Sequence, residues 1–205
     1  MSSLKDDMPE HWPRTGDSLF VQGGWGVDAQ LSTFHGERLY RMKKAFKTSG
    51  DLLVSQTEED SHERQNLVWP IVFCYRQYIE LALKDMLAEH GSKVTPEIKP
   101  NWTDHGLSPL WKSYKTLIAA TLLETSIDDL TEISAIEACI AEFDQVDAGS
   151  FTFRYPTDRL GKQIDIPLLS IDLWHLRNVM DGIFLYLDAS ESVLHEHFNP
   201  SVGRE

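Results

Sequence analysis

Residues 66–89 read NLVWPIVFCYRQYIELALKDMLAE, and they carry the strongest pattern in the chain. Their apolar side chains recur every three or four positions, which predicts one long helix with a broad buried stripe. Arg76, Glu80 and Lys84 follow one another at intervals of four, and Glu80 and Lys84 stand in the favourable order for a helical ion pair. Pro70 lies near the beginning, so the helix either starts one turn earlier or is kinked there. We expect this helix to occupy the centre of the molecule.

The composition is that of an ordinary globular domain with an excess of acidic residues. The chain has 205 residues, of which 41% are hydrophobic and 25% are charged, and its formal net charge is −13. Such a charge opposes binding to nucleic acid over a broad surface, because that binding needs clustered Lys and Arg side chains. We therefore expect no DNA partner, whereas a local contact with RNA stays open.

Three features favour a cytoplasmic location. The sequence has no apolar run near the roughly 18–20 residues that span a bilayer. Its N-terminus lacks the basic start and the apolar core of a signal peptide. Cys74 and Cys139 each lie within an apolar helical pattern, which is typical of reduced thiols in a protein core. We expect no membrane association.

Glycine and serine residues predict where the helices on either side of residue 60 end. A helix is expected from about residue 36 to 48, with Ser49-Gly50 breaking or capping it. The central helix is expected to stop at Gly91, in the left-handed conformation that glycine adopts readily after a helix. A loop containing two prolines follows.

The second half of the chain predicts three more helices. The first is expected to begin with Ser108 as its N-cap and Pro109 in its first turn. The next is expected to start at residue 128 or 129, and the last near Ser170 or Asp172. The last helix is expected to fray towards residues 195–197, since Pro200 follows.

The two remaining segments lack a helical pattern. Residues 151–167 alternate apolar and polar side chains around a turn, which predicts a small β-hairpin. Residues 1–33 are rich in glycine and proline, and we expect an arm that packs over the domain or onto a partner through its aromatic side chains. The predicted organisation is thus an arm, 1–33, and a helical domain, 34–198. The aromatic residues of the arm are Trp12, Phe20 and Trp25.

Four pieces of this chain, in fixed order, resemble a HEPN-type helical domain over about residues 65–190. They are YRQYIELALK at 75–84, DHGLSPLW at 104–111, FRYPTD at 153–158, and the terminal amphipathic helix. The branch of the family in question carries the motifs YRxxIELxLK, HxLxxLW and FRYPxD. The resemblance implies an up-and-down helical bundle that commonly dimerises. Together with the patterns above, the expected fold is mainly α, a HEPN-like up-and-down helical bundle with a small β-hairpin and an extended N-terminal arm.

Members of that family act as ribonucleases in prokaryotic conflict systems, as partners of nucleotidyltransferases, or as non-catalytic binding modules. The catalytic signature of the nucleases is an Arg followed four to six residues later by a His. The His would move a proton at the ribose 2′-hydroxyl or the leaving oxygen, and the Arg would stabilise charge on the phosphate. Arg177 lies in the right region, but Gly182, Ile183 and Phe184 occupy the positions of the His. The standard nuclease pair is therefore absent.

A rearranged catalytic site would have to use residues from separate parts of the chain, because catalytic groups need only meet in the fold. His105 either fixes the loop before a helix by hydrogen bonding or transfers a proton. Arg177 and Asp181 are four apart on a helix, and the interpretation we favour is that they pair with each other. The candidates for a rearranged site are Arg76, His105, Arg154 and Arg177.

Arg76 and Glu80 lie on an otherwise apolar helix, where an unpaired charge would be costly. We favour a buried structural ion pair that orients the helix, joined by Arg154 or Asp158. The alternative is an anion site that Arg76 forms with Arg154 and Arg177.

Positive charge concentrates on the helix predicted at 36–48. The favoured interpretation is a solvated face that includes Lys43 and Lys47 and is balanced by the acidic residues 58–60. The alternative is a contact with an anion or RNA. His195 and His197 do not face one point on a helix, so we expect no metal site there, and no motif indicates a cofactor. The full set of anion-binding candidates is Arg38, Arg41, Lys44, Arg76, Glu80 and Asp158.

The leading functional hypothesis is a non-catalytic interaction module, acting as a homodimer, with a second protein, or both. The missing Arg–His pair, the acidic charge and the aromatic arm favour it over an enzyme. A place in prokaryotic antiviral defence or a toxin–antitoxin system rests on the resemblance alone. The alternatives are a metal-independent ribonuclease with a rearranged active site and a sensor of nucleotides or anions. Ion pairs sealed inside one subunit would favour the module, and convergence of the candidates in one groove would favour the nuclease.

Overall fold

The computed structural model describes residues 15–24, 26, 28–121 and 127–200. The chain divides into two units, Met1–Ser32 and Thr33–Glu205. The described part of the first unit consists of turns and extended backbone. There the Asp28 carboxylate accepts hydrogen bonds from the backbone N–H groups of Gly23 and Gly24, at 2.7 and 3.1 Å. Trp12 and Trp25 of the predicted arm lie outside the described residues.

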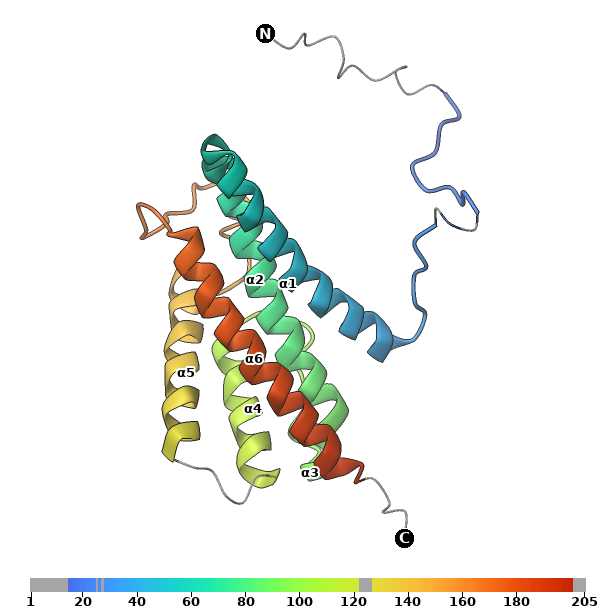
Figure 1. The fold of residues 1–205 in the computed structure, drawn as a ribbon, viewed down its shortest axis with the longest axis vertical. Helices are drawn as coiled ribbons and strands as arrows, with labels where there is room; N and C mark the ends of the chain where they lie inside the picture. The colour runs from blue at the N-terminus through green and yellow to red at the C-terminus, as the bar shows by residue number, and fades with distance from the viewer. Residues whose placement is uncertain (1–14, 25, 27, 122–126, 201–205) are drawn as a thin grey trace. The chain divides into compact units, whose positions relative to one another are not determined.

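The second unit is mainly helical, as predicted (Figure 1). In the described part of the chain no residue belongs to a β-strand. No described helix is both long enough and apolar enough to cross a membrane. A 3₁₀ turn, Ser61–Glu63, precedes α2, and a π-helical turn, Leu87–Gly91, follows it. The α-helices are α1 (His35–Glu59), α2 (Arg64–Met86), α3 (Ser92–Val94), α4 (Leu107–Thr121), α5 (Ile127–Asp147) and α6 (Leu173–Phe198).

Helix α2 is the central element, as its apolar stripe predicts. Helices α1, α4 and α6 all pack against it (Figure 1). Ile71, Ile79 and Leu83 on its stripe are fully buried. Pro70 is the seventh residue of the helix, so the first alternative, an earlier start, describes it best. The proline removes one backbone donor from the ladder, and the tertiary packing of α2 offsets that loss.

Helix α1 does not end at Ser49-Gly50, and the predicted break there is wrong. The helix continues to Glu59, and Gly50 is one of its buried residues. A Cβ atom at Gly50 would lie 2.5 Å from the Cε1 atom of Tyr75 on α2. The glycine therefore serves close packing of two helices. A sequence cannot distinguish that role from helix termination, because the partner is 25 residues away.

Gly91 also differs from its predicted role. Its φ is −57°, in the right-handed region, so it is no left-handed stop. A Cβ atom there would lie 2.1 Å from the carbonyl oxygen of Ile98. Space rather than conformation requires glycine at this position, and the chain continues through the π-helical turn into α3.

The starts of α4 and α6 are capped in different ways. Ser108 is not the N-cap of α4, because the helix already includes Leu107. The carboxylate of Asp144 on α5 accepts the backbone N–H groups of Leu107 and Ser108, at 3.0 and 2.7 Å. The last helix is expected to start near Ser170 or Asp172, and Asp172 is the N-cap of α6, accepting from the N–H groups of Trp174 and His175. Hydrogen bonding from the His175 N–H lowers the pKa of Asp172.

The predicted β-hairpin is reduced to a turn with one antiparallel bridge, between Thr157 and Gln163. The Asp158 carboxylate holds this turn by accepting the N–H groups of Leu160 and Lys162, at 2.8 and 2.9 Å. Upstream, the Phe151 carbonyl accepts two N–H groups and curls the chain away from extended backbone. The alternating pattern at 151–155 therefore belongs to a turn that closes α5.

Candidate functional site

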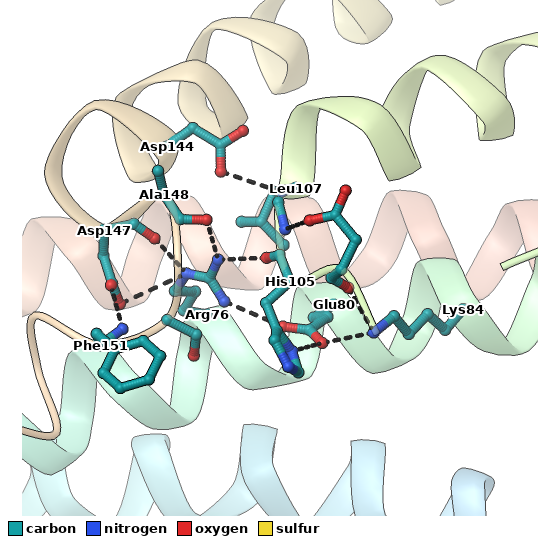
Figure 2. A network of polar contacts seen from close by, with 12 residues as sticks. Arg76, Glu80, Lys84, His105, Leu107, Asp144, Asp147, Ala148 and Phe151 are labelled. Carbon is teal, nitrogen blue, oxygen red and sulfur yellow. Dashed lines mark hydrogen bonds and ion pairs between the residues drawn. The ribbon is translucent and has the colours of Figure 1, made fainter. Parts of the chain in front are cut away.

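Arg76 lies at the centre of a buried polar cluster that joins three segments of the fold (Figure 2). Its side chain is fully buried on α2. The guanidinium donates from Nε to the Asp147 carbonyl at 3.0 Å and from Nη2 to the His105 carbonyl at 2.6 Å. Its Nη1 donates to Glu80 Oε2 at 3.1 Å. One side chain thereby ties α2 to the end of α5 and to the loop before α4.

Glu80 is the anionic centre of this cluster. Its carboxylate also accepts from Lys84 Nζ at 2.8 Å and faces the His105 Nδ1 atom at 2.9 Å. Burial opposes ionisation of Glu80, but hydrogen bonds from Lys84 and His105 outweigh it, so the pKa of Glu80 is lowered. Lys84 makes a further bond to the Asp104 carbonyl at 3.0 Å. The ion pairs expected from the i, i+4 spacing of Arg76, Glu80 and Lys84 are both present.

Asp147 completes the cluster from the last residue of α5. Its carboxylate accepts the backbone N–H groups of Phe151 and Thr152, at 2.6 and 2.9 Å, and fixes the turn that follows the helix. Its second oxygen lies 3.5 Å from Arg76 Nε. Neither Asp147 nor the capping residue Asp144 was among the sequence candidates. An aspartate just before Gly149-Ser150 is a turn signal that could have indicated Asp147, whereas no local signal indicates Asp144.

His105 is the member of the cluster that reaches solvent, with 47% of its side chain exposed. Because an ionised carboxylate only accepts hydrogen bonds, the contact with Glu80 requires the proton on His105 Nδ1. In the neutral ring, Nε2 is then the free acceptor. A carboxylate that orients an imidazole in this way occurs in acid–base catalysis, and the same bond also holds a loop in place. Both roles expected for His105 are compatible with this geometry.

The other two catalytic candidates lie apart from this cluster. Arg154 donates to the Ser150 carbonyl, and its guanidinium lies over the Phe151 ring, 5.2 Å from the centroid. Arg177 on α6 donates to Ser55 Oγ of α1 at 3.1 Å. The structure thus brings Arg76 and His105 together and uses Arg154 and Arg177 elsewhere. Neither Arg154 nor Asp158 joins the Arg76–Glu80 pair, because each is engaged with the backbone of its own turn.

The favoured pairing of Arg177 with Asp181 is wrong. Asp181 binds Lys47 Nζ at 2.6 Å, and Lys47 also binds Asp51 at 2.7 Å. The cause is the packing of α1 beside α6, which places partners from α1 next to both residues. Intrahelical spacing alone does not reveal such competitors.

Two of the basic side chains of α1 are turned inward. Lys43 and Lys47 are buried, so they do not extend a solvated face as expected. Lys43 Nζ lies 2.6 Å from both Asp85 of α2 and Glu191 of α6. The acidic partners of Lys43 and Lys47 therefore come from α2, from α6 and from Asp51 of α1 itself, and not from residues 58–60.

On the outer side of α1, two of the anion-binding candidates, Arg41 and Lys44, interact with residues of the same helix. Arg41 pairs with Glu37 at 2.6 Å, one turn earlier. Lys44 lies over the Tyr40 ring, 5.0 Å from its centroid, and a hydrogen bond with Tyr40 raises the pKa of Lys44. Arg38 also interacts within the molecule. These cations form no shared pocket with Arg76 in the described structure.

Among the described residues, no group of three or more His, Cys, Asp or Glu side chains could hold a metal ion. Comparison of the chain with protein-family models, curated proteins and solved structures found no match in any of the three. The resemblance to HEPN-type domains therefore rests on the motifs of the sequence.

Proposed function

We propose that this chain is a non-catalytic, HEPN-like interaction module that acts by binding another protein or a second copy of itself. The observation that carries the proposal is the state of Arg76. An arginine that stabilises a phosphate must present N–H donors to it. The donors of Arg76 are committed to Glu80, to the Asp147 carbonyl and to the His105 carbonyl, and the side chain is fully buried.

The other buried cations support the same conclusion. Lys43, Lys47 and Lys84 are each held by carboxylates within the subunit. Withdrawing Lys43 or Lys84 towards a ligand would take a cation away from the buried carboxylate of Asp85 or Glu80, which is strongly destabilising. Sealed internal ion pairs of this kind are what we expect of the module and not of the nuclease.

The motif resemblance supplies the wider setting of the proposal. It favours an up-and-down bundle that dimerises or binds a second protein of a prokaryotic defence or toxin–antitoxin system in the cytoplasm. The net charge of −13 is compatible with a protein partner and unfavourable for extended contact with RNA.

An RNA cleavage assay tests the proposal. The purified protein is incubated with total cellular RNA in the presence of a chelator, beside the variants His105→Ala and Arg177→Ala. His62→Ala, which changes an exposed histidine in the middle of the 3₁₀ turn, is the matched control. We expect no cleavage by any of the four proteins. Cleavage that His105→Ala or Arg177→Ala abolishes, and that His62→Ala retains, would overturn the proposal.

A second candidate function is a metal-independent ribonuclease, and one observation favours it. The half-exposed His105 ring is held at Nδ1 by the buried Glu80 carboxylate, which leaves Nε2 as a base. Among the described residues, however, the arginine joined to His105 is Arg76, through the His105 carbonyl and not towards solvent. For this candidate the RNA assay would give cleavage that His105→Ala abolishes.

A further inference from the structure

Side chains of α5 and α6, with one residue of α4, line an open groove. The two helices run in opposite directions, and the groove between them has a volume of about 770 Å³. Ile133 and Ile136 of α5 and Ile183 and Val193 of α6 line its sides, and Ile118 of α4 lies at its floor. Its described lining is mostly aliphatic or small.

The groove continues towards the start of α6. A second hollow of about 510 Å³ shares the lining residues Cys139, Val179 and Ile183 with the first, so the two lie next to each other. Along α5 the lining extends from Glu132 to Val146. At 1.5 Å per residue this stretch is about 21 Å long, which corresponds to roughly four turns of a helix.

The groove has room for side chains from outside. A Cβ atom at Gly182, in the middle of α6, would meet no heavy atom within 4 Å. Leu185 nearby is 67% exposed, and Val193 is 44% exposed. Exposed apolar side chains beside a groove are typical of a binding site for another protein.

The charges along the groove have one sign. Among the described residues that line its two parts, the charged side chains are Glu132, Glu142 and Asp172, and no Lys or Arg is present. Neither Glu132 nor Glu142 takes part in the ion pairs of the described chain. A partner with Lys or Arg beside its apolar face would complement these carboxylates and the net charge of −13.

We propose that the α5–α6 groove binds one amphipathic helix of a partner protein. The apolar face of that helix lies over Ile183 and Gly182, and its flanking Lys or Arg side chains face Glu132 and Glu142. In this mode of recognition, apolar side chains at positions i, i+3, i+4 and i+7 of the bound helix insert into the groove. The inference rests on the proposed function and names the kind of partner and the surface that binds it.

Three labelled synthetic peptides of about 17 residues test the inference by fluorescence anisotropy. The first has Leu at i, i+3, i+4 and i+7 positions with Lys on both flanks. The second has Glu in place of Lys, and the third has the composition of the first in scrambled order. We expect the first peptide to bind at least about tenfold more tightly than the others, and less tightly as salt is added.

Two glycine variants provide the matched pair. Gly182→Phe places a ring in the groove, where the structure leaves space for it, and should lower affinity for the first peptide at least about tenfold. Gly36→Phe changes a glycine of α1 that is equally open, and should leave binding unchanged. Circular dichroism of both variants confirms that they are folded. The double variant Glu132→Lys, Glu142→Lys should remove the preference for Lys over Glu flanks.

Equal binding of the three peptides, or full binding by Gly182→Phe, would overturn the inference. Light scattering tests whether a second copy of the chain occupies the groove instead. If no peptide binds and Gly182→Phe converts a dimer into a monomer, a second copy fills the groove and the inference fails. The RNA assay on the same preparations keeps the two proposals apart. Cleavage of RNA rejects the proposed function whatever the peptides do, whereas absence of both cleavage and peptide binding rejects the groove alone.

Discussion

The polar cluster around Arg76 and the α5–α6 groove reverse the usual placement of charge and apolar surface. Arg76, Glu80 and Lys84 are buried and paired inside the domain. Leu185 and Val193 lie exposed on the outside, along the groove. Charge in this molecule therefore organises the interior, and apolar surface is available to a partner. The comparison separates residues that maintain the fold from residues that a binding function can use without disturbing it.

The largest effect is expected from Glu80→Ala. This change leaves Arg76 and Lys84 buried without their carboxylate, which costs about 3–5 kcal/mol in comparable buried pairs. Urea unfolding measures the loss of free energy. The matched control is Glu137→Ala, which breaks an exposed pair with Lys115 and should cost at most about 1 kcal/mol. Equal losses in the two variants would contradict the view that the cluster organises the interior.

The second prediction concerns Gly91→Ala, which adds one carbon atom in a closed region. The new Cβ would meet the Ile98 carbonyl oxygen at 2.1 Å, so the backbone must move. Overpacking of this kind costs about 1–3 kcal/mol. Thermal unfolding of the variant should show a lower midpoint. An unchanged midpoint would mean that the backbone around residue 98 can move aside without a loss of stability.

Local patterns predicted much of this fold, because they depend on neighbours in the chain. The stripe of α2 predicted the central helix, and Ser170 and Asp172 predicted the region where the last helix starts. The roles of Gly50 and Gly91 were missed because each is set by an atom that another segment brings close. The cap of α4 by Asp144 was missed for the same reason, since the carboxylate comes from 36 residues downstream.

In the candidate site, too, contacts within one helix were predictable and contacts between segments were not. The i, i+4 spacing of Arg76, Glu80 and Lys84 predicted their pairing, because all three lie on one helix. The spacing could not predict that other N–H groups of the Arg76 guanidinium donate to the backbone carbonyls of His105 and Asp147. The pairing of Arg177 with Asp181 failed because α1 supplies Lys47 and Ser55 at the same place. The groove was not predictable either, since an apolar stripe does not say which part of it stays uncovered.

The third prediction concerns the pH dependence of the stability that the buried cluster around Arg76 contributes. The pKa of Glu80 in the folded protein is lowered below its ordinary value of 4.5, chiefly because bonds from Lys84 and His105 outweigh burial. The ionised carboxylate therefore stabilises the fold above about pH 4.5, and this contribution is lost as pH falls through the lowered pKa. One such group changes the free energy of unfolding by at most about 1.4 kcal/mol per pH unit.

Urea unfolding of the wild type and Glu80→Gln between about pH 3 and 7 measures this contribution. We expect the wild type to be more stable near neutral pH and the difference to shrink in acid. Groups that face Glu80 are Arg76, Lys84 and His105, so His105→Gln should be run in parallel to remove the contact of the imidazole with Glu80. A difference that stays constant across the range would mean that Glu80 titrates alike in the folded and unfolded chain.

The smallest effect is expected from Gly182→Ala in the groove. The added methyl group meets no atom within 4 Å, and alanine is the better residue in the middle of a helix. The change should therefore stabilise the protein by about 0.5–1 kcal/mol, measured as a higher urea midpoint with an unchanged slope. Gly91→Ala, the same substitution in the closed region, should move the midpoint the other way. If both variants lose stability, the groove at Gly182 is filled in solution, and a second copy of the chain is the occupant to test first.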